Sequence, residues 1–254
     1  MFKAKTVKID LLAQMFPERI SEMDTLLSVS TKIYIDFANV RPWADKLGWH
    51  VEPFRVKQFF DSFGAVKEIK IYNGTLIGDK ESEHENKDLT KAFGPGCITK
   101  PVKIMQKSID VSSISPSSTD ILKSFIRPSL LRRLKVEVVE YLNAQLGELN
   151  KLGTYFIEDR KCNFDVEIGR DMMLAFEKKE ADCFVLWSGD SDFAGPIEQL
   201  LQNGKKVFIF STPRRVASEL ASLTSQGLFI YDIQKIKNFI CWNREMDGPK
   251  PAGS

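Results

Sequence analysis

Short apolar runs alternate along much of the chain with longer stretches in which apolar residues recur at helical spacing. The runs predict strands at 32–36, 66–72, 183–187, 207–210 and 227–231, and the helical spacing predicts helices at 54–63, 164–176, 196–202 and 215–223. The run at 183–187 (CFVLW) is apolar throughout, which is typical of a parallel strand covered on both faces. The alternation predicts an α/β fold with a doubly wound, mainly parallel central sheet of about five to six strands and helices on both faces.

The regular pattern is interrupted from about residue 75 to 160, and we expect a helical insertion there. Residues 78–91 are polar and fit an exposed loop or a short helix, and residues 128–149 have strong helical spacing. Residues 98–105 fit an edge strand, because Pro101 is tolerated at an edge and not in mid-sheet.

The predicted domain occupies residues 31–240. Residues 1–30 predict an amphipathic lead-in helix broken at Pro17, and residues 241–254 a C-terminal tail. We expect the strand that begins at Val66 to stop before Asn73-Gly74, a common turn pair.

The composition of the 254-residue chain, with 43% hydrophobic and 28% charged residues, is that of a globular protein. With a net charge of +2, a nucleic-acid-binding surface would require local clustering of basic residues. The four cysteines form no C-x-x-C pair and there are two histidines, which argues against a zinc site and for a reducing compartment. No apolar segment approaches membrane-spanning length, so we expect a soluble, cytoplasmic protein with no membrane partner.

Two aspartates, Asp190 and Asp192, follow the predicted strand 183–187 directly and are flanked by Ser188 and Ser191. Ligands bind at the carboxyl ends of the strands in open α/β sheets. Two carboxylates about 4 Å apart repel each other by about 4 kcal/mol at an effective dielectric constant near 20. A hard divalent cation would offset this repulsion. The alternative is that one aspartate caps the next helix and the other is solvated.

Other acidic residues are candidates for the same edge of the sheet. Asp36 ends the first predicted strand, and Asn39 lies in the loop that follows. Helix capping is as good an interpretation of Asp36 as catalysis. Asp165 and Asp171 lie on one predicted helix, about 9 Å apart along its axis. One of the two can point into a shared cluster, and both can do so only if they enter it at different levels along the helix. Glu167 falls on another face, where we expect it to be solvated.

Three segments resemble the NYN domain family of the PIN-like nuclease superfamily, most closely its bacterial LabA-like branch. They are IYIDFAN at 33–39, KCNFDVEIGRDM at 161–172 and SGDSDF at 188–193, followed by a G-K-x-V strand at 204–207. The resemblance covers about residues 31–74 and 161–232.

The resemblance implies a Mg²⁺- or Mn²⁺-dependent ribonuclease. By motif, Asp36, Asp165, Asp190 and Asp192 would form the catalytic and metal-binding cluster, with Asn39 and Ser188 as supporting polar groups. Asp171 would orient the loop at Gly189. Phosphodiester hydrolysis places negative charge on oxygen, which a metal ion stabilises without a histidine.

An acidic pocket binds RNA only where basic residues border it. We expect Lys161, Arg214 and Arg215 at this rim, although a solvated turn is an equally good interpretation of the two arginines. Lys100, Lys103, Arg132 and Arg133 would extend the track, although the last two more often form a solvated helix face. Trp43 and Trp49 would stack on single-stranded bases, although packing is the commoner role of such residues.

Two alternatives to a ribonuclease stay open. The same fold also serves in noncatalytic RNA-binding or adaptor modules, and the same metal chemistry cuts DNA in structure-specific nucleases. RNA is the expected partner, and the sequence leaves a homodimer open.

Overall fold

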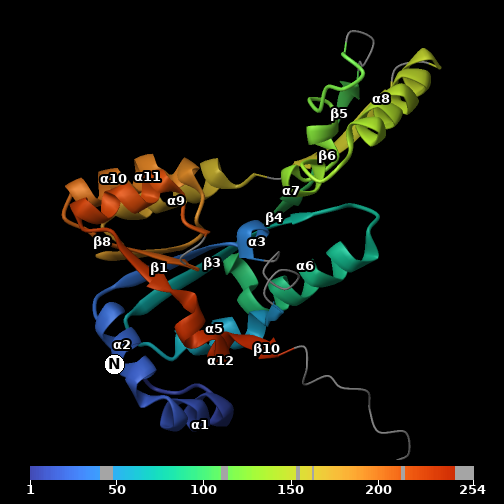
Figure 1. Cartoon of the computed structure of the whole chain (residues 1–254). Coiled ribbons are helices and arrows are strands. Elements are labelled where there is room, and N and C mark those ends of the chain that lie inside the picture. The colour runs from blue at the N-terminus through green and yellow to red at the C-terminus, as the bar shows by residue number, and fades with distance from the viewer. Residues whose placement is uncertain (41–47, 110–113, 153–154, 162, 213–214, 244–254) are drawn as a thin grey trace, which may run out of the picture. The chain divides into compact units, whose positions relative to one another are not determined.

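The computed structural model describes residues 1–40, 48–109, 114–152, 155–161, 163–212 and 215–243 (Figure 1). The chain divides into two compact units: unit 1 is Met1–Pro101 with Cys162–Ser254, and unit 2 is Val102–Lys161. Within the described ranges, no helix combines the length and the apolar character needed to cross a bilayer.

Unit 1 is built on a six-stranded sheet in which every pairing is parallel. In their order across the sheet the strands are β4 (Cys97–Pro101), β3 (Val66–Thr75), β1 (Thr31–Asp36), β7 (Cys183–Trp187), β8 (Lys206–Ser211) and β9 (Phe229–Asp232). The predicted doubly wound α/β fold is confirmed. The strand order reverses between β1 and β7, and this switch point is where open α/β sheets bind ligands.

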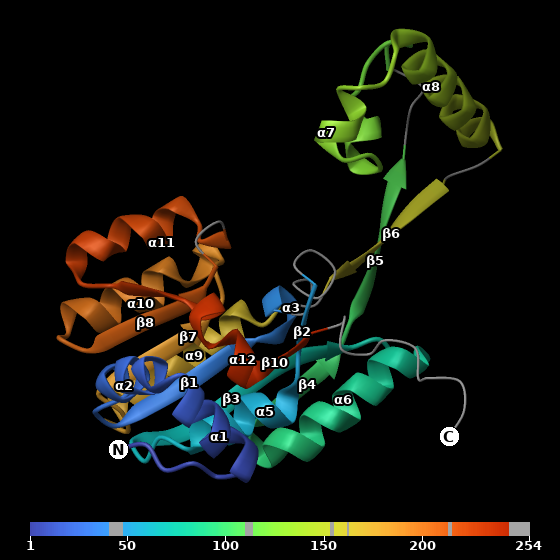
Figure 2. The same cartoon turned by 60° about the horizontal axis from the view of Figure 1, so that its bottom comes forward.

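Helices cover both faces of the sheet (Figures 1 and 2). One face is covered by α1 (Val7–Met15), α2 (Pro17–Leu26), α5 (Pro53–Asp61), α6 (Lys80–Phe93) and α12 (Lys237–Ile240). The other is covered by α9 (Asp165–Glu177), α10 (Ala194–Gln202) and α11 (Ser218–Ser222). The remaining elements of unit 1 are α3 (Phe37–Val40), the 3₁₀ turns η1 (Gly94–Gly96), η3 (Ser191–Phe193), η5 (Leu223–Gln226) and η6 (Ile233–Ile236), and the antiparallel pair β2 (Trp49–Val51) and β10 (Cys241–Asn243).

Each central strand divides its side chains between two cores, because successive residues of a strand point to opposite faces. In β1, Ile33 and Ile35 join the core beneath α5, whereas Tyr34 joins the core beneath α9. By the same alternation Asp36 lies on the face of the sheet that α9 covers. The carboxylate of Asp36 therefore lies on the same face of the sheet as α9, the helix that begins at Asp165.

Several predicted elements differ from the structure, and the strand predicted at 98–105 is divided between β4 and the separate strand Lys103–Ile109. β3 continues through Asn73-Gly74 to Thr75, because β4 pairs with it over Ile71–Thr75. The polar segment after it is the 14-residue helix α6, which buries Leu89 and Phe93. The lead-in is two helices, since Pro17 suits the first turn of a helix and not its interior.

The separate unit begins later than the insertion expected at about 75–160. Residues up to Pro101 belong to unit 1, because α6 packs on the sheet and β4 forms its edge. Pro101 is the last residue of that edge strand, where its missing N–H costs no hydrogen bond within the sheet.

Unit 2 consists of an antiparallel strand pair and a small helical lobe. The strands are β5 (Lys103–Ile109) and β6 (Tyr155–Lys161), and the lobe contains η2 (Leu122–Ser124), α7 (Pro128–Leu131) and α8 (Val136–Lys151). The helix predicted at 128–149 is therefore two helices. Leu122, Leu131 and Val139 form the core of the lobe.

Candidate functional site

Asp36 ends β1 between strands β3 and β7 and is almost completely buried, with 4% of its surface exposed. Asn39, from the short helix α3, donates a hydrogen bond of 2.5 Å from Nδ2 to Asp36 Oδ2. Ser188, the first residue after β7, donates one of 3.3 Å from Oγ to the same oxygen. The two supporting residues expected from the sequence thus both contact Asp36.

The environment of Asp36 disfavours its charged form. Burial raises the pKa of its carboxyl group, and the negative charge of Asp190 raises it further, whereas the hydrogen bonds from Asn39 and Ser188 lower it. The net pKa lies above the usual value. A positive charge placed beside Asp36 would reverse this imbalance.

Asp190 and Asp192 lie in the tight loop after β7, which depends on Gly189. A β-carbon at Gly189 would lie 1.8 Å from the carbonyl oxygen of Arg215, so only glycine fits. The amide of Asp190 donates to Ser188 Oγ, and the amide of Asp192 donates to Asp190 Oδ1 at 3.3 Å. Asp190 therefore caps the turn η3, which agrees with the alternative in which one of the two aspartates caps the following helix.

Asp165 is the first residue of α9, and Asn163 fixes its backbone by accepting a hydrogen bond of 2.8 Å at Oδ1 from the Asp165 amide. The pKa of the Asp165 carboxyl is raised to about 6, and burial is the largest cause. A hydrogen bond shared with the Asp192 carboxyl and the charges of Asp190 and Asp36 act in the same direction, although Asn163 opposes them.

Four carboxyl groups from three distant segments are thereby brought within electrostatic reach of one another. These are Asp36 at the end of β1, Asp165 at the start of α9, and Asp190 and Asp192 after β7. Within the described part of the chain, Lys70 and Arg170 pair with Asp171 and Lys100 pairs with Glu167, and not with these four. These three cations therefore do not neutralise the cluster.

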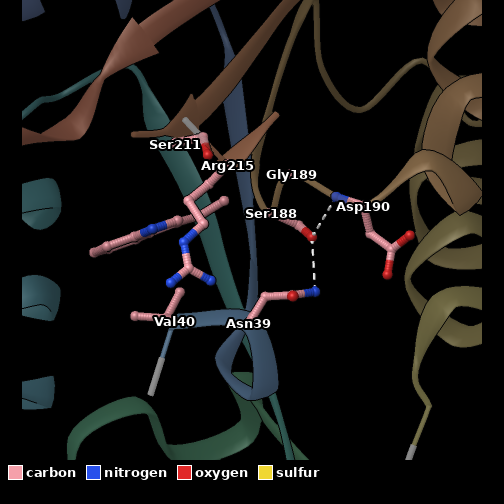
Figure 3. Close-up of a pocket in the computed structure, with 8 residues that line it drawn as sticks. Asn39, Val40, Ser188, Gly189, Asp190, Ser211 and Arg215 are labelled. Carbon is pink, nitrogen blue, oxygen red and sulfur yellow. Dashed lines mark hydrogen bonds between the residues drawn. The ribbon is translucent and has the colours of Figure 1, made fainter. Parts of the chain in front are cut away.

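A cavity of about 130 Å³ lies beside this cluster, large enough for about four water molecules or one phosphate group. Asn39, Ser188, Asp190 and Arg215 are among the residues that line it (Figure 3). In that view the Arg215 guanidinium and the Asp190 carboxylate lie on opposite sides of the Ser188–Asn39 hydrogen bond, which measures 3.1 Å. The cavity thus has a cationic wall and an anionic wall.

The donor set matches the chemistry of Mg²⁺ or Mn²⁺, which prefer oxygen ligands. Among the described residues, no three acidic, histidine or cysteine side chains have the spacing of an assembled metal-binding group. Mg²⁺ keeps several water molecules and takes one or two carboxylates directly, so an assembled set of three is not required. A cation here would offset the repulsion from neighbouring aspartates, which adds to the effect of burial in raising the pKa of Asp36 and of Asp165.

Asp171 has a different position from the one expected. Its Oδ2 accepts hydrogen bonds of 2.9 Å from Lys70 Nζ and from the Tyr72 hydroxyl, both on β3, and its Oδ1 accepts from Arg170. These contacts join α9 to β3, and none of them reaches the loop at Gly189. Burial alone would raise the pKa of Asp171, but these three hydrogen bonds outweigh it and the net pKa is low.

Glu167, which was expected to be solvated, is partly exposed and is also held by a cation. It forms an ion pair of 2.6 Å with Lys100, which also donates to the Asn163 carbonyl and lies 4.3 Å from the centre of the Phe164 ring. Lys100 therefore belongs to unit 1 and fixes the start of α9, next to Asp165.

Several candidates for the nucleic-acid rim lie outside the described residues or away from the cluster. Arg214 and Trp43 are not described, nor are the side chains of Lys161 and Lys103, whose backbones pair in β5 and β6 of unit 2. Trp49 is half-buried, with Lys237 Nζ 5.6 Å from its ring centre, which supports packing over base stacking. Arg132 and Arg133 are exposed on unit 2.

Sequence reasoning assigned no role to Asn163 and only a weak one to Lys100. Asn163 had a local signal, because an asparagine two residues before a helix start commonly accepts a backbone amide hydrogen bond. Lys100 had none, since its contacts are 63 and 67 residues away in the sequence.

Comparison with known proteins gives three matches. The family model of the NYN domain matches residues 30–231. The chain is 25% identical over 219 residues to the low amplitude and bright protein LabA of Synechococcus elongatus, which covers 86% of this chain and 90% of that protein. It is also similar to a crystal structure of a protein of unknown function from Vibrio parahaemolyticus, with 14% identity, a TM-score of 0.45, and coverage of 84% and 95% of the two chains.

Proposed function

The chain belongs to the NYN domain family, as its motifs predicted, and from that premise we propose that it is a metal-dependent ribonuclease whose active site is the acidic cluster of Asp36, Asp165, Asp190 and Asp192. NYN domains form part of the PIN-like nuclease superfamily, which supports a nuclease-related role. The observation that carries the proposal is the convergence of these four carboxyl groups from three distant segments next to one small cavity, with Asp36 held by hydrogen bonds from Asn39 and Ser188. Such crowding of like charges is costly for folding and is typical of a site that binds a cation.

Each group of the site has a distinct task in this proposal. Asp36 is held by hydrogen bonds from Asn39 and Ser188, so its carboxylate keeps one orientation. Asp190 and Asp165 face the site from other segments and would share the cation with Asp36. Mg²⁺ or Mn²⁺ bound there would offset the charge that develops on the phosphate oxygens and lower the pKa of a water molecule.

The remaining groups act on the substrate and on the attacking water. Asp192, hydrogen-bonded to Asp165, is positioned to accept a hydrogen bond from a water molecule and to orient it for in-line attack on phosphorus. Arg215, on the opposite wall of the cavity, would bind a non-bridging oxygen of the scissile phosphate or of its neighbour. Binding and orientation of the phosphodiester thus come from the two walls of one small cavity.

A cleavage assay on a mixed RNA pool with Mg²⁺, Mn²⁺ or EDTA tests the proposal. We expect shortening of RNA with either metal and none in EDTA, and a loss of rate of about 100-fold or more in Asp36→Asn and Asp190→Asn. Asp232→Asn is the matched control, because Asp232 ends β9 at the same edge of the sheet and caps a turn, a role that asparagine also fills.

The assay also separates the alternatives. RNA retarded in a gel equally with metal and with EDTA, and never shortened, would indicate a noncatalytic RNA-binding module. Flap DNA cut faster than single-stranded or hairpin RNA would indicate a DNA nuclease. Metal-dependent cleavage that survives Asp190→Asn would exclude this cluster as the active site.

A further inference from the structure

A line of exposed apolar side chains runs along α8 of unit 2. It consists of Val138, Tyr141, Leu149 and Leu152, of whose surfaces 40%, 62%, 44% and 77% are exposed. With Gln145 between them, the spacing is three, four, four and three residues, which keeps all five side chains on one side of a helix. We name this line the α8 stripe.

The α8 stripe is not the face by which α8 packs in its own lobe. That face is formed by Val139, Leu142 and Leu146, which contact Leu122 and Leu131. Among the described side chains of unit 2, the buried apolar ones are Leu122, Leu131 and Val139 alone. So small a core leaves the lobe with little stability of its own, and a second covered face on α8 would add to it.

The α8 stripe is symmetric in sequence about its middle residue. Val138 and Leu152 lie seven residues before and after Gln145, and Tyr141 and Leu149 lie four residues before and after it. If two copies of α8 pair in antiparallel orientation about a twofold axis at Gln145, each valine faces a leucine and each tyrosine faces a leucine. A twofold interface requires such self-complementarity.

The charges beside the α8 stripe favour the same orientation. Glu137 lies in the first turn of α8 and Lys151 in its last, and both are exposed. Lys151 also forms an exposed ion pair of 2.6 Å with Glu148 of the same helix, and such surface pairs are weak enough to exchange partners. Antiparallel pairing brings Glu137 of one copy near Lys151 of the other. It also places the positive end of each helix dipole beside the negative end of the other, which is favourable. Parallel pairing would instead place like charges side by side.

We propose that α8 is a self-association surface, by which two copies of this chain pair their α8 helices in antiparallel orientation about Gln145. The inference is independent of the proposed nuclease activity. The stripe spans about 21 Å of helix, which is short for a stable dimer interface, so the association is concentration-dependent.

Sedimentation equilibrium of the full chain over a range of concentrations tests the proposal. We expect a monomer–dimer equilibrium that Val138→Glu weakens about tenfold or more, because the substitution buries a charge in the interface. Val136→Glu is the matched control: Val136 is also exposed, at 59%, but lies off the stripe at the first position of α8, where glutamate is favourable. We expect it to leave the equilibrium unchanged.

A charge exchange tests the orientation and guards against a variant that simply unfolds. Glu137→Lys and Lys151→Glu should each weaken the dimer, and the double variant should restore it. Restoration cannot arise from damage to the lobe. A chain that stays monomeric at high concentration, or that responds equally to Val138→Glu and Val136→Glu, would overturn the proposal, and a double variant weaker than both single variants would overturn the antiparallel pairing.

Discussion

The backbone of Gly189 lies against the backbone of Arg215 so closely that a β-carbon at position 189 would stand 1.8 Å from the Arg215 carbonyl oxygen. The Gly189 carbonyl also accepts a hydrogen bond of 2.9 Å from the Ala217 amide. The loop with Asp190 and Asp192 is therefore fixed against the segment that carries Arg215. One close approach positions both walls of the cavity.

Gly189→Ala should separate these two segments, since the clash is with backbone and not with a flexible side chain. We expect a loss of about 2–4 kcal/mol in the free energy of unfolding, measured by urea denaturation, and loss of RNA cleavage. Gly195→Ala is the control, because nothing lies within 4 Å of a β-carbon at that helical position and alanine favours a helix by up to about 1 kcal/mol. Equal stability of the Gly189→Ala variant and the wild type would contradict the close approach.

The crowding of carboxylates should make the acidic cluster a cost to stability when no cation is bound. In EDTA at neutral pH we expect Asp165→Asn to be more stable than the wild type, by about 1 kcal/mol once the partial exposure of Asp165 is allowed for. Excess Mn²⁺, at about 100 times its Kd, should stabilise the wild type by about 2.7 kcal/mol and the variant much less.

Chemical denaturation in EDTA and in Mn²⁺ measures both effects. Asp232→Asn serves again as the control and should follow the wild type under both conditions. Equal stabilisation of wild type and Asp165→Asn by Mn²⁺ would argue that the ion binds elsewhere.

Arg215 is expected to bind substrate phosphate and not to take part in the chemical step. Arg215→Ala should raise KM about tenfold with a smaller change in kcat, and the slope of log affinity against log salt should fall by about 1. Lys206→Ala is the control for lost charge, because Lys206 begins β8 at the opposite edge of the sheet and is exposed. A change in kcat alone would assign Arg215 to the reaction itself.

Asp171 should stabilise the fold through its contacts with β3 and not through the active-site loop. We expect Asp171→Asn to lose about 1–2 kcal/mol of unfolding free energy at pH 7, because its hydrogen bonds to Lys70 and Arg170 involve charged donors. An asparagine at position 171 still accepts a hydrogen bond from the Tyr72 hydroxyl. Tyr72→Phe, made both in the wild type and in Asp171→Asn, therefore measures the contribution of that hydrogen bond separately.

The pH dependence of this difference has a definite sign. The folded pKa of Asp171 is lowered, so its contribution is fully present above the unfolded pKa of about 3.9 and is lost as pH falls through the folded pKa. The gap between wild type and Asp171→Asn should stay constant from pH 7 to about pH 5 and shrink below about pH 4. A gap that persists into strong acid would contradict the ion pair.

Sequence by itself predicted the strands β1, β3, β7, β8 and β9 of the central sheet, the fold class and the edge of the sheet where the acidic residues gather, but it did not predict β2, β6 or β10. The run at 183–187 is apolar at every position, and such a run is typical of a parallel strand that is buried on both faces. Asp36 is the last residue of β1 and Asp190 lies in the loop after β7. Because all parallel strands of a sheet end at one edge, their placement follows from local pattern and one topological rule. The motifs around them were sufficient to predict the family.

Tertiary structure alone decided which side chains meet at that edge. Asp165 reaches Asp192 and Asp171 reaches β3 because of strand order and helix orientation, which no local pattern encodes. The ion pair of Lys100 with Glu167 and the contact of Gly189 with Arg215 likewise join segments distant in the chain. Hydrophobic periodicity determines whether a segment forms a helix or a strand and which face it buries. Which segments contact each other depends on how all the elements pack in the folded protein.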